Sequence, residues 1–267
     1  MSERKAIFIT GGGSGIGRAI AQKFAQEGWF VGLGDISESG MKETAALIGE
    51  DNAFCHVFDV RDRAAWDEAL DAFVAVSGRM DVLANNAGIP VGGSIIENSE
   101  DEITRCLDIN LKGVLFGAQA AHPHLKKTAP DSCLLNTASA AGIYGSAGGS
   151  VYCATKFGVR GITESLDGEW APDGIKVRSL MPSFIETPLL DMVPNAKTNE
   201  HVRARVKQAG LEITPVEEVS DAAWRAVHED KMHWPVGKTA RSIAFAARWM
   251  PGRVRKRMRG QMQLLGD

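Results

Sequence analysis

The chain alternates between short apolar runs and longer segments in which apolar residues recur every three or four positions. The short runs are rich in valine, isoleucine and phenylalanine, as buried parallel strands are, and the longer segments have the spacing of amphipathic helices. This alternation, without internal repeats, predicts the α/β class: a doubly wound, Rossmann-type parallel sheet with helices on both faces. The predicted strands lie at 5–10, 29–35, 52–60, 79–84, 131–138 and 174–181.

The remaining segments complete this prediction. Residues 233–238 predict an edge strand, where Pro235 is tolerated. Residues 100–121 predict a helix interrupted near Gly113. Residues 183–213 form a connection longer than most, which predicts either a lid over a substrate or a plain helical excursion. We therefore expect a dinucleotide-binding and catalytic domain at 1–240, including that lid, and a basic helical tail at 241–267.

Composition narrows the class of protein. The 267 residues are 44% hydrophobic and 24% charged, which is ordinary for a globular protein. No run of eighteen apolar residues occurs, and the first residues lack a secretory apolar region, so we expect a cytoplasmic protein. Six scattered histidines predict no metal site. The four cysteines show no paired spacing and are expected to be reduced thiols, with one of them beside the candidate site: Cys55, Cys106, Cys133 and Cys153.

Charge is unevenly distributed along the chain. The net charge is −3, yet residues 231–266 hold nine Lys or Arg and no Asp or Glu. Ile243, Phe245, Ala246 and Trp249 lie among arginines and could form a basic amphipathic helix, broken by Pro251, in weak peripheral contact with anionic lipid. The alternative is an ordinary terminal helix packed on the lid or on a neighbouring subunit. Nucleic acid is not an expected partner, because the overall charge is negative and no binding module is visible.

A glycine cluster follows the first predicted strand. Gly11, Gly15 and Gly17 occur in GGGSGIG, directly before a helical segment. Strand, glycine turn and helix in this order can place backbone N–H groups and a helix N-terminus against a pyrophosphate. Asp35 ends the second strand, about 20 residues further on, where its carboxylate would bind the ribose 2′-hydroxyl of NAD and repel the 2′-phosphate of NADP. Two flanking residues add no cation to this pocket: Ser14 and Ile36.

Polar residues also stand at the ends of the later strands. Asp59, followed by Val60, could accept a hydrogen bond from the adenine amino group, could be an ordinary helix N-cap, or could have both roles. Asn110, inside the helix at 100–121, could bend that helix by bonding to backbone. Ligands of open parallel sheets bind beyond the carboxyl ends of the strands. One cleft is therefore predicted by the residues that lie at these ends or in the turns just after them: Gly15, Asp35, Asn86, Ser139 and Pro182. A tight turn follows the fourth strand at Asn85, Asn86, Ala87 and Gly88.

The candidate chemistry lies between residues 139 and 156. Tyr152 and Lys156 are four residues apart, so a helix would place them on one face. A nearby ammonium favours the phenolate and would lower the pKa of the tyrosine, which could then exchange a proton with an alcohol or carbonyl oxygen. Ser139 follows the fifth strand, where its hydroxyl would face the cleft. The alternative is a solvated helix face that carries Tyr and Lys by chance.

In this order the motifs resemble those of the short-chain dehydrogenase/reductase family, in its compact single-domain form, over residues 4–240. The resemblance rests on TGGGSGIG at 10–17 with Ile16, on Asp35 and Asp59, on NNAG at 85–88, on Asn110 and Ser139, on YCATK at 152–156, and on Pro182, Ile185 and Thr187. The sequence departs from the family at two positions: Arg178 replaces an Asn, and Ser183 replaces a Gly, which could redirect the backbone near the nicotinamide.

The resemblance implies specific roles. Tyr152 would be the acid/base, Lys156 would lower its pKa and bind the nicotinamide ribose, and Ser139 would hold the substrate oxygen. Asn110 would anchor a water that relays protons. It also implies a homodimer or homotetramer packed through the Asn110 and Tyr152 helices. The nicotinamide carboxamide would meet Ile185 and Thr187.

Three predicted walls of the cleft, at 89–91, 140–151 and 184–193, are apolar or small and lack a converging Arg or Lys clamp. They favour a hydrophobic secondary alcohol or ketone, such as a steroid, a terpenoid or an aryl-alkyl alcohol, as the partner of NAD. Two alternatives are other reductase chemistry on the same fold and a non-catalytic NAD-binding sensor or scaffold. The second is disfavoured because Ser139, Tyr152 and Lys156 are all present.

Overall fold

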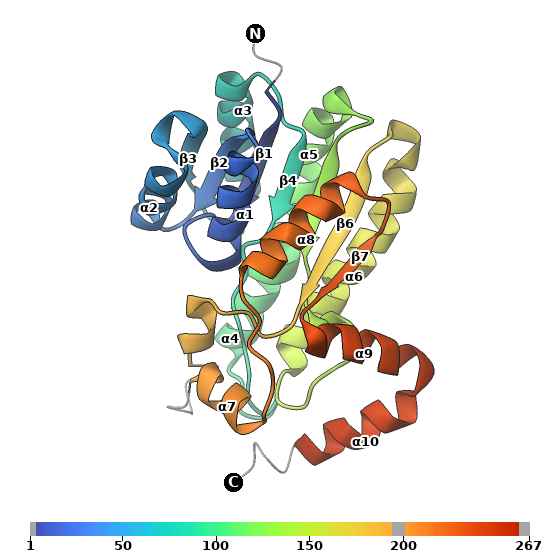
Figure 1. Ribbon diagram of the computed structural model, residues 1–267. Helices are drawn as coiled ribbons and strands as arrows, with labels where there is room; N and C mark the ends of the chain where they lie inside the picture. The colour runs from blue at the N-terminus through green and yellow to red at the C-terminus, as the bar shows by residue number, and fades with distance from the viewer. Residues whose placement is uncertain (1–3, 194–200, 262–267) are drawn as a thin grey trace.

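The computed structural model describes residues 4–193 and 201–261 (Figure 1). Its seven strands form one parallel sheet in the order β3-β2-β1-β4-β5-β6-β7. The order reverses between β1 and β4, which confirms the predicted doubly wound, Rossmann-type arrangement. The strands are β1 Ala6–Thr10, β2 Phe30–Asp35, β3 Ala53–Val57, β4 Val82–Asn85, β5 Cys133–Thr137, β6 Lys176–Pro182 and β7 His233–Val236.

Helices cover both faces because alternate strand residues point to opposite sides. On β1, Ile7 and Ile9 face one hydrophobic core, and Phe8 faces the other. The first core contains Phe24 and packs under α1 Gly15–Gln26, α2 Glu38–Ile48 and α8 Glu217–His228. The second contains Trp66 and packs under α3 Arg63–Ser77, α5 Gly113–Thr128 and α6 Ser150–Trp170. The sheet is therefore buried on both sides, as its apolar strands predict.

Two predicted elements differ in detail. The helix expected at 100–121 is α4 Glu100–Leu107, one π-helical turn at Asp108–Lys112 and then α5, so the interruption lies just before Gly113. The third strand ends at Val57 and not at Val60, which leaves Asp59 and Val60 in a loop. β7 is the edge strand expected at 233–238.

Two segments of the C-terminal third, the connection 183–213 and the tail, lie beyond the carboxyl ends of the strands. The connection 183–213 holds a short 3-10 turn at Pro188–Asp191 and α7 Val202–Gln208. The tail forms α9 Lys238–Trp249 and α10 Pro251–Gln261, so the predicted boundary at residue 240 falls inside α9. Of the helices in the described ranges, none is both long enough and apolar enough to span a membrane.

Candidate active site

An open cavity of about 1190 Å³ lies at the carboxyl ends of β1, β2, β4, β5 and β6. Most of the predicted site residues line it, although they come from segments far apart in the sequence. Gly17 and Asn110 do not line it and are buried behind its wall. The predicted residues on the cavity wall are Gly11, Ser14, Gly15, Ile16, Asp35, Ile36, Asp59, Val60, Asn86, Ala87, Gly88, Ser139, Tyr152, Lys156, Pro182, Ile185 and Thr187.

The glycine turn opens the N-terminus of α1 to this cavity. Gly11 and Gly15 have φ values of +68° and +51°, which side chains rarely adopt. A Cβ on Gly17 would lie 2.1 Å from the carbonyl oxygen of Gly11, so the helix can approach the turn only because residue 17 is glycine. The Ser14 side chain forms no capping bond, and the first turn has no acidic residue. The positive end of the helix therefore faces the cavity, a setting that suits a phosphate.

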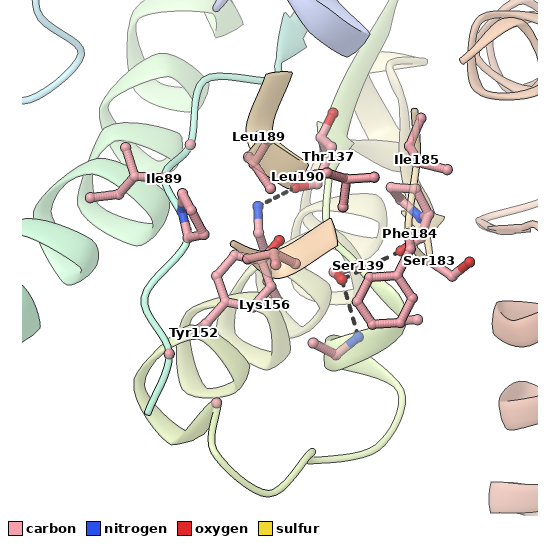
Figure 2. A pocket seen from close by; sticks show the side chains of 18 of the residues that line it. Ile89, Thr137, Ser139, Tyr152, Lys156, Ser183, Phe184, Ile185, Leu189 and Leu190 are labelled. Atoms are coloured by element: carbon pink, nitrogen blue, oxygen red, sulfur yellow. Dashed lines mark hydrogen bonds between the residues drawn. The ribbon is translucent and has the colours of Figure 1, made fainter. Parts of the chain in front are cut away.

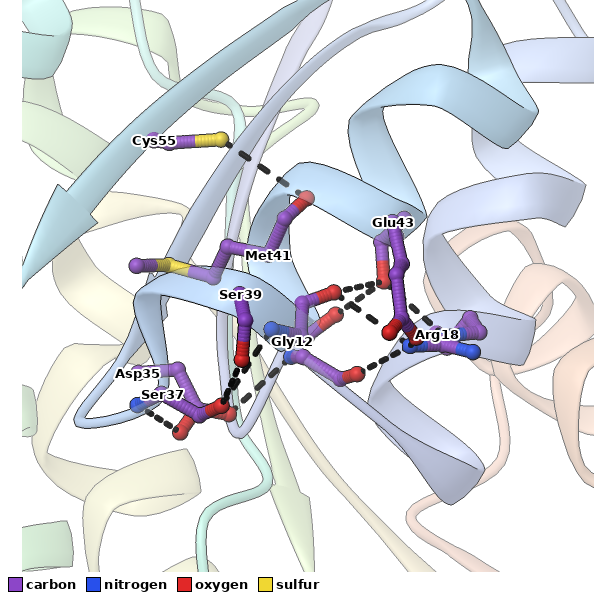
Figure 3. A network of polar contacts seen from close by, with 11 residues as sticks. Gly12, Arg18, Asp35, Ser37, Ser39, Met41, Glu43 and Cys55 are labelled. Atoms are coloured by element: carbon purple, nitrogen blue, oxygen red, sulfur yellow. Dashed lines mark hydrogen bonds and ion pairs between the residues drawn. The ribbon is translucent and has the colours of Figure 1, made fainter.

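Asp35 ends β2 beside this turn (Figure 3). One of its carboxylate oxygens accepts a hydrogen bond from the Gly13 N–H at 3.0 Å, and the other accepts from the Ser37 N–H at 3.0 Å. Arg18 follows the glycines, but its guanidinium donates to Glu43 at 2.8 Å and to Thr44 at 3.0 Å. The carboxylate is thus fixed by backbone groups and not by an ion pair with this arginine.

Asp59 is held by Arg61, and the two form a bidentate ion pair at the cavity wall. Its oxygens accept from the guanidinium at 2.6 to 3.0 Å, and these hydrogen bonds hold the pKa of Asp59 below its usual range. The alternative of a helix N-cap is wrong, because Asp62 caps α3 by accepting from the Ala64 and Ala65 N–H groups. The predicted contact between Asp59 and adenine stays a prediction.

Two threonines that sequence reasoning missed hold the turn after β4. The Thr10 hydroxyl accepts from the N–H groups of Asn86 and Ala87 at 3.0 and 3.1 Å. The Asn86 side chain donates to the Thr10 carbonyl at 3.0 Å and accepts from the Thr137 hydroxyl at 3.2 Å. The sequence did contain a signal for these two residues, because a threonine ends each of the strands that flank β4: Thr10 in β1 and Thr137 in β5. These bonds join the ends of β1, β4 and β5 into one rigid edge.

Asn110 lies in the π-helical turn and is fully buried. Its side chain accepts from the Ile89 N–H at 2.8 Å and donates to the Ile89 carbonyl at 2.9 Å. It therefore bonds to the backbone of the loop after β4, and it also donates to the Cys106 thiol one turn back in its own helix at 3.4 Å. Single π-turns often mark functional sites. The geometry shows that Asn110 positions the cavity wall at residue 89.

Ser139, Tyr152 and Lys156 meet on one side of the cavity (Figure 2). The Lys156 ammonium donates to the Thr137 carbonyl at 2.8 Å and lies 5.6 Å from the centroid of the Tyr152 ring. The Ser139 hydroxyl accepts from the Ala141 N–H at 3.1 Å and donates to the Pro182 carbonyl at 3.4 Å. A hydroxyl, a phenol and an ammonium thus face one space, as the sequence predicts.

The pKa of the phenol moves opposite to the prediction. Burial raises the pKa of Tyr152 to about 12, and a hydrogen bond with Ser139 opposes this rise. Burial also lowers the pKa of Lys156 to about 8, with the Cys106 thiol acting in the opposite direction. Burial is the largest influence on the phenol, and the expected lowering by Lys156 does not outweigh it. Tyr152 is consequently a protonated group at neutral pH, suited to donating a proton.

A further part of the cavity wall is formed by β6 and the segment that follows it. Pro182, Ser183 and Ile185 line this part. The Ser183 hydroxyl is buried and has no hydrogen-bond partner within the described ranges. Its N–H donates to the Val236 carbonyl at 3.2 Å, which keeps this segment joined to β7 despite the replacement of glycine. Arg178 is buried outside the cavity wall and bonds to Asp167 at 2.8 Å and Asp230 at 2.9 Å.

The residues of the outer wall contradict the prediction that no Arg or Lys side chains converge on the cavity. Arg205 from α7, Lys238 from α9, and Arg253 and Arg257 from α10 all line it, so the cavity is not free of cations. These cations were not expected because α7, α9 and α10 belong to the C-terminal third of the chain and reach the cavity only through the packing of the whole fold. Apolar residues lie between these cations: Val202, Val206, Leu211, Ile243, Val254 and Met258.

The inner wall beside Tyr152 remains apolar, with Ile89, Val91, Phe184 and Leu190 among its residues. Cys153 also lines it, and burial raises the pKa of its thiol. All four cysteines are free thiols. Over the described part of the chain, no group of three or more His, Cys, Asp or Glu could hold a metal ion.

Comparison with known proteins agrees with this geometry. Residues 5–198 match the family model described as short chain dehydrogenase. The chain is 35% identical to meso-2,3-butanediol dehydrogenase of Serratia marcescens, over 75% of this chain and 80% of that protein. It is 38% identical to the 3-oxoacyl-acyl-carrier-protein reductase FabG of Thermotoga maritima, over 76% and 83% of the two chains.

A third relative and a solved structure extend this likeness. The chain is 37% identical to 3-alpha-(or 20-beta)-hydroxysteroid dehydrogenase of Mycobacterium tuberculosis, over 71% and 72% of the two chains. Its fold is similar to that of a short chain dehydrogenase/reductase from Burkholderia phymatum in complex with NAD, with a TM-score of 0.83 and 25% identity. That match covers 96% of this chain and 97% of the other.

Proposed function

This chain belongs to the short-chain dehydrogenase/reductase family of oxidoreductases, and we propose that it interconverts a secondary alcohol with an apolar body and the corresponding ketone, using NAD. The observation that carries the proposal is the convergence of Ser139, Tyr152 and Lys156 on one cavity that also contains the glycine turn. Two relatives, the butanediol and hydroxysteroid dehydrogenases, are named for secondary alcohols, which supports this substrate class.

The residues present fit a dinucleotide along the whole cavity. The open N-terminus of α1 suits the pyrophosphate, and Asp35 suits the hydroxyls of the adenosine ribose. The unpartnered Ser183 hydroxyl, beside Ile185 and Thr187, suits a carboxamide. The carboxylate of Asp35 would repel a 2′-phosphate, which favours NAD over NADP. When bound, the nicotinamide supplies or accepts the hydride, chemistry that no side chain here can perform.

The chain's own contribution is proton transfer. In the direction of reduction, the Tyr152 O–H donates its proton to the substrate oxygen, and the phenolate that forms is stabilised by the Lys156 ammonium. Ser139 donates a hydrogen bond to the same oxygen. The raised pKa of Tyr152, about 12, keeps the phenol loaded with its proton until the substrate carbonyl gains charge. Oxidation of the alcohol runs through the same groups in reverse.

Asn110 has a supporting role in this proposal. Its side chain is committed to both backbone groups of Ile89, which fixes the wall next to the substrate. The resemblance assigns it a water that relays protons, and this assignment stays a prediction. The contacts of Asn110 support a positioning role for the residue.

The proposal includes a homodimer or homotetramer. Leu107 on α4, Leu115 on α5 and Phe157 on α6 are 38%, 44% and 42% exposed, so the helices that carry Asn110 and Tyr152 present apolar side chains to solvent. A second copy packed on these helices would cover them. Light scattering of the purified protein would measure the assembly directly.

The test is a screen of hydrophobic secondary alcohols with NAD and with NADP, following the absorbance of the reduced cofactor. We expect turnover of at least one apolar alcohol with NAD and much slower turnover with NADP. A 3-oxoacyl thioester with NADH belongs in the same screen, because one relative is a reductase of that class. Turnover of the thioester alone would replace the proposed substrate class, and binding of NAD without any turnover would favour the sensor.

A further inference from the structure

We infer that the tail formed by α9 and α10 is a docking surface for an anionic lipid bilayer, and that it places the mouth of the cavity at the bilayer surface. This inference goes beyond the proposed oxidoreductase activity, and only the route described below for an apolar substrate rests on that proposal. It rests on the charge, the exposure and the position of the tail, which lies beyond the carboxyl ends of the strands (Figure 1).

One face of α9 carries aromatic and cationic side chains together. Phe245 and Trp249 are one turn apart, and they are 61% and 65% exposed. Arg241 and Arg248 lie on the same exposed face, with the Arg248 guanidinium 5.3 Å from the centroid of the Trp249 ring. Large aromatic side chains left in solvent next to cations match the interface of a bilayer, where rings enter the boundary and cations meet phosphates.

α10 adds a dense positive charge. Its cations are all exposed, and no carboxylate of the described residues forms an ion pair with them. Within the described ranges, α9 forms two long ion pairs, Lys238 with Glu212 at 3.8 Å and Arg241 with Glu218 at 3.5 Å. The cations of α10 are Arg253, Arg255, Lys256, Arg257 and Arg259. This surface therefore keeps its charge available for an anionic partner.

The same two helices form the outer wall of the cavity. Ser242, Ile243 and Ala246 of α9 line it, on the face adjacent to Phe245 and Trp249. Arg253 and Arg257 of α10 line it as well. A bilayer that binds the exposed face would thus lie beside the cavity mouth. An apolar substrate dissolved in the bilayer could then enter the cavity without crossing bulk water. The role of the cations on the outer wall would be to bind the lipid headgroups beside this entrance.

A second copy of the chain fits this surface poorly. A two-fold symmetric contact brings the same patch of both copies together, and here it would place α10 cations against α10 cations. A polyanion without an apolar phase would bind the arginines but leave Phe245 and Trp249 in water. The bilayer is the partner that satisfies both features of the surface.

The test is sedimentation of the full-length protein with vesicles of phosphatidylcholine alone and of phosphatidylcholine mixed with phosphatidylglycerol. We expect binding to the mixed vesicles at low salt, weaker binding at physiological salt, and little binding to phosphatidylcholine alone. Two variants should each weaken binding by roughly tenfold or more, because each removes part of the attraction: Phe245→Ser with Trp249→Ser, and Arg255→Gln with Lys256→Gln.

Matched controls lie on other helices. Leu47 and Val76, on α2 and α3, are 59% and 63% exposed, so Leu47→Ser with Val76→Ser should leave vesicle binding unchanged. Lys42→Gln with Lys127→Gln is the corresponding charge control. Equal binding by tail and control variants would overturn the inference. So would a change in the oligomeric state of the Phe245 and Trp249 variant without loss of vesicle binding, since a second copy would then be the partner. Activity on a water-soluble alcohol reports separately on the oxidoreductase.

Discussion

At the glycine-turn end of the cavity the wall is held by main-chain groups and hydrogen-bonded polar side chains, whereas at the outer end it is formed by side chains from α7, α9 and α10, several of which are exposed. At the glycine-turn end, Thr10 and Asn86 form hydrogen bonds that join two strand ends. At the outer end, the Lys238 and Arg257 side chains are exposed. The inner end is thus rigidly positioned for chemistry that needs fixed geometry, and the outer end presents a surface that can vary with the substrate.

This contrast predicts where substitutions act. Changes at the inner end should abolish chemistry or cofactor binding, and changes at the outer end should alter substrate affinity by small factors. The expected effects below run from the largest to the smallest.

The largest effect is expected at the proton donor. Tyr152→Phe removes the O–H that transfers the proton, so turnover should fall by about a thousandfold or more while NAD binding is retained. The chain has one other tyrosine, Tyr144, which makes Tyr144→Phe a matched control that should keep most of the activity. Steady-state rates with titration of cofactor binding check both variants. Substantial turnover by Tyr152→Phe would remove the phenol from the mechanism.

A smaller loss is expected where the helix meets the turn. Gly17→Ala places a methyl group 2.1 Å from the Gly11 carbonyl oxygen, so the turn must shift. We expect NAD binding to weaken by about a hundredfold and the free energy of unfolding to fall by about 1–3 kcal/mol. Gly161→Ala, on α6 with no atom near the added methyl, should be neutral or stabilising. Thermal unfolding and cofactor titration measure both, and equal behaviour of the two variants would contradict the close approach.

Cofactor preference is expected to depend on one carboxylate. Asp35→Ala removes the negative charge beside the ribose site, so the preference for NAD over NADP should fall by roughly tenfold or more. Its oxygens also accept from the N–H groups of Gly13 and Ser37, so a small loss of stability should accompany the change. The ratio of kcat/KM for the two cofactors is the measurement. An unchanged ratio would place the preference elsewhere.

The pH profile tests the ammonium. Burial lowers the pKa of Lys156 to about 8, so above this pH the group loses the positive charge that stabilises the phenolate. The value of kcat/KM for ketone reduction should be level below pH 8 and fall severalfold above it. Initial rates across this range, at saturating NADH, check the sign. A profile that rises through the same range would contradict the assigned role.

The smallest effect is expected at the outer wall. Ile243→Ala shortens one apolar side chain that lines the cavity from α9, so KM for an apolar substrate should rise by only about two- to tenfold. The value of kcat should change little, because residue 243 lies on α9 and not on the elements that carry the phenol and the glycine turn. Steady-state kinetics separate the two constants. A large drop in kcat would mean that the two ends of the cavity are not functionally distinct.

The same contrast explains what could be predicted from the sequence. The inner end is encoded locally: a strand, a glycine turn and a helix follow one another, and Asp35 ends the next strand. Tyr152 and Lys156 share a helix, so their spacing was sufficient. The outer end depends on where α9 and α10 pack after the sheet is complete, and local patterns do not contain this information. The cations that they bring to the cavity were therefore missed.

Two features near the chemistry also escaped prediction for physical reasons. The pKa of Tyr152 is raised because burial outweighs the hydrogen bond with Ser139, and burial depends on the whole fold. The bonds of Asn110 to Ile89 depend on a π-helical turn, which no residue pattern in this segment announces. The N-cap of α3 is Asp62 and not the predicted Asp59, which lies about one turn earlier, so the start of this helix was misplaced.

The most direct test of the central claim is transfer of deuterium from a secondary alcohol labelled at the carbinol carbon to NAD, followed by mass spectrometry of the recovered cofactor. The account predicts that the wild-type protein labels the nicotinamide and that Tyr152→Phe binds NAD but transfers almost no label. Equal labelling by the two proteins would contradict it.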